Sequence, residues 1–347
     1  MSNKLLEKLS NADSVASHES EVRKIIKEEL SYYSSSFKYD GIGSLIVTKQ
    51  SKVKDAPTIM FAAHMDEVGY MIRSVSEIGM AYLTKLGNVE GRTEEMQLVR
   101  AKKENGEKVE GILNVERNDR NEVEQRYVDF GFSTSQEFYE AGLNIGSIVC
   151  FASDYRELAA DNIVCGKAFD DRVGCYSLIE AMKALEKVEL DVNVVAAFTS
   201  SEEVGTRGGR LTAKIVNPDV FFAVDVAKHP ELDRGFKDHR KLGQGPMIEF
   251  YDKTMVPNPN VLKFVCNLAD NKHLSYQRDM FQGGGTDAGT AHLENDGITS
   301  LVLGLPLRYC HDSYSLANEE DLESLAVLIE EISKNISQNV IQEFYEF

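Results

Sequence analysis

Four short apolar segments constrain the fold of this chain more than any other feature. They cover residues 58–63 (TIMFAA), 192–198 (VNVVAAF), 220–224 (VFFAV) and 298–303 (ITSLVL). Apolar runs of this length are typical of strands that are buried on both faces of a parallel or mixed sheet. A sheet of this kind needs helices to cover its two faces.

Helical patterns alternate with these segments. Residues 171–188 have the pattern of one helix, and Val22, Ile26 and Leu30 share one face of another. Asn318 is a favourable N-cap for a further helix with regularly spaced apolar residues. We therefore predict an α/β fold in which flanking helices cover a mixed central sheet.

The middle of the chain has a different pattern. From about residue 67 to residue 162, Gly-punctuated segments of alternating polarity, such as GILNVERN and GSIVCF, indicate short antiparallel strands. We predict a smaller β-rich domain, residues 67–162, inserted into a discontinuous larger domain of residues 1–66 and 163–347. A chain of 347 residues is long enough for two such domains.

The composition excludes several classes of partner. A net charge of −18 opposes binding to phosphate backbones and anionic lipid surfaces, so we expect no nucleic acid and no membrane partner. No segment has the pattern of a signal peptide or a membrane span. Five scattered cysteines suit reduced thiols better than a disulfide framework. These observations together favour a cytoplasmic protein.

Residues of types that can bind metal ions follow each of the four apolar segments. Because the carboxyl ends of parallel strands meet at one edge of an open α/β sheet, we expect these side chains to converge. Each alone would more often be a structural histidine or a solvated acidic pair, so the prediction depends on the whole set. In chain order the residues are His64 and Asp66, Glu202 and Glu203, Asp225, and His311.

The fifth predicted metal ligand is Asp170, in the segment KAFDDRVGC. The other four are His64, Glu203, Asp225 and His311. Asp170 begins a helix, and the dipole at a helix N-terminus stabilises a carboxylate. If Asp170 bridges two ions, His64 and Asp225 complete the protein ligands of one, and Glu203 and His311 those of the other. With a shared water, each ion has four N and O donors, which suits zinc and also cobalt. We predict two such divalent ions per subunit.

Two carboxylates, Asp66 and Glu202, are left over and are the predicted catalytic residues. Asp66 lies two residues after His64, where its carboxylate is expected to accept the second N–H of the imidazole and fix its tautomer. Glu202 adjoins the ligand Glu203 and is expected to take a proton from the bridging water and deliver it to the departing amine.

A Gly-rich segment, residues 282–289 (QGGGTDAG), lacks the spacing of a Walker loop or of a dinucleotide-binding loop. Its glycines allow a ligand to approach the backbone closely. We predict substrate contacts from Gly284, Thr286 and Asp287, with an ordinary tight turn as the alternative.

The ordered segments AAHMDEVG, KAFDDRVG, TSSEEVGTRG, AVDVA, GGGTDAG and PLRYCHD resemble those of the tetrahedral (TET-type) dimetal aminopeptidases, in the glutamyl aminopeptidase branch. The match spans nearly the whole chain. The resemblance implies a zinc exopeptidase-like fold, hydrolysis of the N-terminal residue of peptides, and the same five ligands and base that are named above. It also implies that the insert is a dimerisation domain and that the subunits form a hollow tetrahedral homododecamer.

Three other functions fit the sequence less well. A related zinc carboxypeptidase or aminoacylase has its extra domain between the fourth and fifth ligands, whereas here the long gap separates Asp66 from Asp170. A glycosidase uses paired carboxylates but does not need two histidines at strand ends. A non-enzymatic assembly protein with a decayed site would not retain every ligand.

The expected preference for N-terminal Glu or Asp follows from the resemblance to the glutamyl branch, and a broader leucyl or deblocking-type specificity is the alternative. An acidic substrate side chain that enters an acidic site must meet a cation. Lys228 and Arg308 each lie three residues from a predicted ligand, Asp225 and His311 respectively, and are the predicted pocket residues. Alternatively, Arg308 orients ligands or binds backbone, and Lys228 points to solvent.

Overall fold

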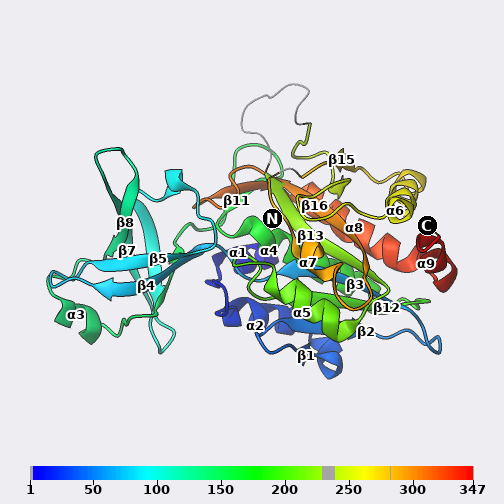
Figure 1. The fold of residues 1–347 in the computed structure, drawn as a ribbon, viewed down its shortest axis with the longest axis horizontal. Coiled ribbons are helices and arrows are strands. Elements are labelled where there is room, and N and C mark those ends of the chain that lie inside the picture. Colours follow the sequence, from blue (N-terminus) through cyan, green and yellow to red (C-terminus); the bar gives the residue numbers. More distant parts are fainter. Residues whose placement is uncertain (1–2, 229–238, 282, 347) are drawn as a thin grey trace.

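An eight-stranded mixed sheet forms the centre of the larger domain (Figure 1). The computed structural model describes residues 3–228, 239–281 and 283–346. The four central strands run parallel to one another, and the strands at both edges include antiparallel pairs. In spatial order the strands are β1 (Lys38–Tyr39), β2 (Leu45–Lys49), β12 (Asn193–Thr199), β3 (Thr58–His64), β13 (Val220–Lys228), β16 (Thr299–Leu307), β14 (Met247–Glu249) and β15 (Gln277–Asp279).

Helices cover both faces of this sheet. Successive side chains of a strand point to opposite faces, so Phe61 and Ala63 enter one apolar core while Met60 and Ala62 enter the other. The first core is closed by α1 (Lys4–Asn11), α2 (Ser20–Glu29), α4 (Phe169–Leu185), α6 (Pro259–Asn271), α8 (Glu319–Asn335) and α9 (Gln338–Phe344). The second core is closed by α5 (Arg207–Val216) and α7 (Asp287–Ala291).

The order of the strands places a topological switch point at the carboxyl ends of the central strands. β12 and β13 lie on opposite sides of β3, and the helices that lead into them, α4 and α5, lie on opposite faces of the sheet. β13 pairs with β3 only as far as Ala223 but continues beside β16 to Lys228. Such switch points in open α/β sheets are where ligands bind.

A closed antiparallel barrel forms the smaller domain and projects from one end of the larger one (Figure 1). It has its own apolar core, and the helix α3 (Ser135–Glu140) packs Phe138 into it. The strands, in order around the barrel, are β4 (Gly69–Val75), β5 (Ala81–Leu86), β8 (Val123–Asp129), β7 (Lys108–Arg117), β6 (Gln97–Lys102) and β9 (Ile148–Phe151).

A small three-stranded sheet lies where the chain returns from the barrel. In this sheet β11 (Ile163–Gly166), which precedes Asp170, pairs with β17 (Ser315–Asn318), which follows His311. The pairing holds the segments that carry these two predicted ligands near each other. The remaining strand of this sheet is β10 (Arg156–Glu157), and the short 3₁₀ helices of the chain are η1 (Ser31–Ser36) and η2 (Gly91–Thr93).

The predicted fold class is confirmed, including the mixed sheet and the β-rich insertion. Asn318 caps α8 as predicted, because its side chain accepts a hydrogen bond from the backbone N–H of Glu320. One local expectation was wrong, because Asp225 lies inside β13 rather than at its end. Asp170 stands in the first turn of α4, as expected, although its own backbone is not helical (φ −79°, ψ 106°). Within the described residues, no helix has the length and apolar character needed to span a bilayer.

Candidate metal centre and active site

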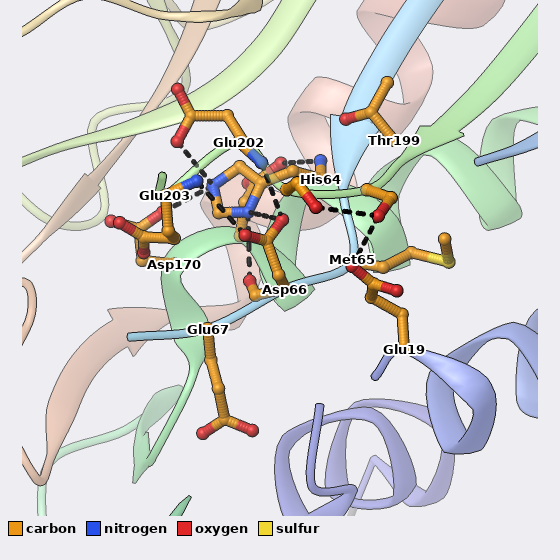
Figure 2. A network of polar contacts seen from close by, with 12 residues as sticks. Glu19, His64, Met65, Asp66, Glu67, Asp170, Thr199, Glu202 and Glu203 are labelled. Carbon is orange, nitrogen blue, oxygen red and sulfur yellow. Dashed lines mark hydrogen bonds and ion pairs between the residues drawn. The ribbon is translucent and has the colours of Figure 1, made fainter. Parts of the chain in front are cut away.

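His64, the last residue of β3, lies in the middle of a cluster of carboxylates (Figure 2). Its Nε2 atom is 2.9 Å from Oδ1 of Asp170 and 4.0 Å from Oε2 of Glu202. Its side chain is only 3% exposed. Burial lowers the pKa of His64, but the carboxylates of Asp170 and Asp66 outweigh burial and raise the pKa well above 6.5.

Asp170 connects the two predicted histidine ligands. Its Oδ1 faces His64, while its Oδ2 is 3.1 Å from Nε2 of His311. The same nitrogen of His311 is 3.3 Å from Oε2 of Glu203. Burial lowers the pKa of His311, but Glu203 and Asp170 outweigh burial and raise it to about 10. The two oxygens of one carboxylate are thus directed at two different sets of donors, which is the geometry of a bridging ligand.

Burial raises the pKa values of the remaining carboxyl groups of the cluster. It raises the pKa of Glu203 to about 7 and that of Glu202 well above 4.5. It also raises the pKa of Asp225 well above 3.8, and the charge of Asp170 raises it further. Acidic side chains gathered in this way repel one another unless cations lie between them.

The donor set therefore fits divalent metal ions. The ligand atoms of His64, Asp170 and Glu203 lie within 4.8 Å of one another, as do those of Asp170, Cys310 and His311. Within the described part of the chain, Oε1 of Glu203 is buried without a hydrogen-bond partner. Bound cations would neutralise the carboxylates and give this oxygen a partner.

Asp66 orders the site through different atoms from those expected. Nδ1 of His64 is 3.0 Å from the backbone carbonyl oxygen of Asp66 and 3.6 Å from its carboxylate, so the carbonyl is the acceptor that fixes the imidazole tautomer. The Asp66 carboxylate instead accepts hydrogen bonds from the backbone N–H groups of Glu202 (3.0 Å) and Glu203 (3.1 Å). Asp66 thus positions the turn that carries the base and one ligand.

Sequence reasoning missed two acidic residues that hold this framework. Asp171 accepts hydrogen bonds from the backbone N–H groups of His64 (3.2 Å) and Gly174 (3.1 Å), so it joins the end of β3 to α4. Glu67 points away from the cluster (Figure 2) and binds Lys167, whose Nζ is 2.7 Å from Oε1. The adjacent acidic residues in AFDDR and HMDE were the only available signal, and it does not tell a ligand from its neighbour.

In the Gly-rich segment, the predicted contact residues Thr286 and Asp287 both have hydrogen-bond partners within the fold. Thr286 caps α7 and donates a hydrogen bond to Asp252 (3.2 Å). Asp287 is buried and accepts hydrogen bonds from the hydroxyl of Thr199 (2.6 Å) and the backbone N–H of Gly209 (3.2 Å). Both side chains connect neighbouring elements beneath the site.

Of the other residues in this Gly-rich segment, Gly284 is described, whereas Gln282 lies outside the described residues. The carbonyl of Gly284 accepts a hydrogen bond from the backbone N–H of Lys253 (3.1 Å), so this residue also has a partner within the fold.

The two predicted pocket cations differ in their surroundings. Nζ of Lys228 is 3.5 Å from a carboxylate oxygen of Glu90, and the side chain is 35% exposed. Arg308 is half-buried, and its buried Nε atom has no hydrogen-bond partner among the described residues. Arg308 directly follows the last residue of β16 and forms an isolated antiparallel bridge with Leu316.

Known proteins resemble this chain over nearly its whole length. A glutamyl aminopeptidase of Lactococcus lactis is 29% identical, with 98% of each chain covered. A lysyl aminopeptidase of Pyrococcus furiosus is also 29% identical, with 92% of this chain and 93% of the relative covered. The names of these two relatives refer to N-terminal residues of opposite charge.

Solved structures share the fold closely. A TET aminopeptidase from a marine sediment archaeon of the Thaumarchaeota is 30% identical, with a TM-score of 0.93 and coverage of 98% of this chain and 99% of that one. The TET1 peptidase of Pyrococcus horikoshii, which can assemble into a tetrahedron or a large octahedral shell, is 27% identical, with a TM-score of 0.86 and coverage of 96% and 99%.

The family model described as M42 glutamyl aminopeptidase matches residues 43–328, which include all five predicted metal ligands. The buried carboxylates, the two histidines and the bridging position of Asp170 are the parts that a metal-dependent peptidase needs. The chain therefore belongs to the M42 family and is a metallo-aminopeptidase, a hydrolase that acts on peptide bonds.

Proposed function

We propose that this aminopeptidase uses two divalent ions, zinc or cobalt, to remove N-terminal Glu or Asp from peptides. One ion would be held by His64, Asp225 and one oxygen of Asp170. The other would be held by Glu203, His311 and the second oxygen of Asp170. The observation that supports this division is that the two carboxylate oxygens of Asp170 face different histidines, at 2.9 and 3.1 Å.

Ions bound there would polarise the scissile carbonyl and lower the pKa of a bound water. Glu202 is placed to accept the proton of the attacking water, because its carboxylate reaches within 4.0 Å of Nε2 of His64 without being needed as a ligand. Burial raises the pKa of Glu202, which helps it to hold that proton and return it to the departing amine. Asp66 keeps Glu202 in place through its backbone N–H.

Chelation tests the metal requirement directly. Exhaustive removal of metal should abolish hydrolysis of an aminoacyl reporter substrate, and added zinc or cobalt should restore it. Full turnover by protein that elemental analysis shows to be free of metal would disprove the dimetal mechanism. Comparison of the two restored activities also shows which ion supports faster turnover.

The acidic preference is supported by Arg308, one of the two cations that the sequence suggested. Its Nε is buried without a partner among the described residues, whereas Lys228 already faces Glu90. A substrate carboxylate would satisfy Arg308 and offset the repulsion of a site rich in Asp and Glu. Of the two candidates we therefore assign the specificity role to Arg308.

Substrates with different N-terminal residues separate the possibilities. We expect kcat/KM to be higher for glutamyl than for leucyl or lysyl reporters. Arg308→Met should reduce the glutamyl to leucyl ratio by about 30- to 150-fold, which corresponds to a charged contact of about 2–3 kcal/mol, and Lys228→Met is the matched control. A parent enzyme that prefers lysyl or leucyl substrates would contradict the acidic preference. An unchanged ratio in Arg308→Met would contradict the role of Arg308.

We also propose that the barrel is a dimerisation domain and that twelve subunits form a hollow tetrahedral particle. The barrel projects from the larger domain and presents the apolar side chains of Leu98 and Ile112 on its outer surface, where they are 45% and 37% exposed. These residues are direct register partners on neighbouring strands, so they form one patch. The similar TET1 peptidase assembles into closed shells.

A further inference from the structure

A cysteine lies next to the proposed metal centre. The Sγ atom of Cys310 is 2.9 Å from Oδ2 of Asp170, and Cys310 directly precedes the ligand His311. The neighbouring backbone is tightly turned, because Tyr309 and His311 both have positive φ angles of about 60°. These turns direct the thiol and the imidazole toward the same carboxylate oxygen.

The geometry is that of donors around one ion. Bonds of about 2.0–2.3 Å to a tetrahedral ion place its donor atoms roughly 3–4 Å apart. Oδ2 of Asp170 lies 2.9 Å from the Cys310 sulfur and 3.1 Å from Nε2 of His311, and that nitrogen is 3.3 Å from Glu203. The ligand atoms of Asp170, Cys310 and His311 all lie within 4.8 Å of one another.

A second observation points to an ion at the same place. The side chain of Glu203 is 4% exposed, and its Oε1 atom is buried without a hydrogen-bond partner in the described part of the structure. Glu203 is held toward His311 by its other oxygen. A cation bound beside the His311 imidazole would give this buried carboxylate oxygen a partner.

The other four cysteines have different surroundings. Cys175 donates a hydrogen bond to the backbone carbonyl of His64 (3.2 Å) from the opposite side of the strand end. Cys165 is on β11, and Cys266 is on α6 within the apolar core. Cys150 belongs to the barrel strand β9. Among the five thiols, all of which lie in the described part of the chain, only that of Cys310 is within hydrogen-bond distance of a carboxylate oxygen of a proposed metal ligand.

We propose that the Cys310 sulfur is an additional ligand of the ion held by Asp170, Glu203 and His311. The S–H proton leaves to solvent when the sulfur binds the ion. A sulfur donor makes this site favour thiophilic ions such as zinc over harder ions such as manganese. The inference rests on the proposed two-metal centre, but it assigns one further donor to one of the two ions.

Cobalt substitution tests the sulfur ligand without depending on activity. Cobalt(II) bound by nitrogen and oxygen shows visible d–d bands, and a coordinated thiolate adds a charge-transfer band in the near ultraviolet. We expect both in the cobalt-loaded parent protein. The Cys310→Ser variant should keep the d–d bands and lose the charge-transfer band, while Cys266→Ser should keep both.

The outcomes separate the inference from the function on which it rests. If the d–d bands appear without a charge-transfer band in the parent, or if Cys310→Ser retains that band, the sulfur ligand is disproved while the metal centre stands. If the parent binds no cobalt and no zinc, the metal centre itself is disproved.

Thiol protection gives a second measurement on the unmodified chain. Iodoacetamide alkylation of Cys310, followed by mass spectrometry of the peptide, should be slowed about tenfold or more in zinc-loaded protein relative to metal-free protein, because metal coordination occupies the nucleophilic sulfur. Equal rates in the two states would overturn the proposal, even if Cys310→Ser failed to fold.

Discussion

At the scale of single residues, the adjacent acidic side chains of Glu202 and Glu203 have different proposed roles. Glu203 faces His311, while Glu202 lies toward His64 and is not required as a ligand. The Asp66 carboxylate binds the backbone N–H of both, so their positions are fixed together. Two neighbouring residues of the same type can therefore take different roles, because their side chains leave the turn in different directions.

Replacement of Glu202 by Gln should separate catalysis from metal binding. The amide keeps the shape of the side chain but cannot accept a proton, so kcat should fall by on the order of 10²–10⁴. Metal analysis should still find two ions per chain. Glu203→Gln is the matched control and should lose an ion. The reverse result, in which Glu202→Gln loses an ion and Glu203→Gln keeps both, would exchange the two roles.

At the scale of secondary-structure elements, α5 supports the turn that carries both glutamates. Gly208, in the first turn of α5, packs directly against the backbone of Ser200. A Cβ atom at this position would lie 2.5 Å from the carbonyl oxygen of Ser200 and 2.7 Å from its nitrogen. Only glycine allows this close approach, because the neighbouring atoms are backbone and cannot rotate away.

Gly208→Ala should therefore push α5 away from the active-site turn. We expect the free energy of unfolding to fall by about 1–3 kcal/mol, as in other overpacked sites, and kcat to fall with it because Glu202 moves. Thermal unfolding and steady-state kinetics measure the two effects. Gly41→Ala is the control, because nothing lies within 4 Å of its added Cβ. Equal stability and kcat in the two variants would show that α5 does not set the position of the turn.

A buried ion-pair network joins the barrel to the larger domain. Asp13, which follows α1, pairs with Arg100 of β6 (2.7 Å), Lys108 of β7 (2.7 Å) and the fully buried Lys167 (3.1 Å). Burial raises the pKa of Asp13, but these three cations outweigh burial and hold the pKa below its ordinary value of 3.8. The carboxylate thus stabilises the junction only while it is ionised.

Asp13→Asn should lower the free energy of unfolding by about 3 kcal/mol near neutral pH, because it removes one partner of a buried ion pair. Since the folded-state pKa is lowered, the stabilisation is fully present above the unfolded-state pKa and is lost as the pH falls below about 4. Calorimetric unfolding as a function of pH should show the parent and variant converging in acid. The exposed Asp55→Asn is the control, and a constant difference at all pH values would argue against this linkage.

At the scale of the whole molecule, closed assembly would place the apolar patch of the barrel in contact with another subunit. The double variant Leu98→Glu with Ile112→Glu introduces charges into that contact and should reduce the particle from twelve subunits to smaller species. Light scattering coupled to size exclusion measures the mass. Val53→Glu, at an exposed loop of the larger domain, is the control. A parent protein that is monomeric in solution would contradict the proposed assembly.

The sequence by itself determined the layered fold and indicated several residues that the structure brings together. Apolar runs at 58–63 and 192–198 form strands β3 and β12, because short, mostly apolar segments rich in β-branched and aromatic residues are typical of strands buried on both faces of a sheet. Metal-binding residues after these runs were expected to meet, because parallel strands share a carboxyl edge. The structure brings His64, Asp170 and Glu203 within ligand distance of one another.

Only the tertiary structure decided which atoms do what. Asp66 fixes His64 through a carbonyl rather than a carboxylate, and Asp287 accepts hydrogen bonds from Thr199 and Gly209. The thiol of Cys310 lies beside Asp170, from which it is separated by 140 residues in the chain. Residue type and spacing indicate which side chains gather, but their orientation depends on turns, register and burial, and these are set by contacts between distant segments.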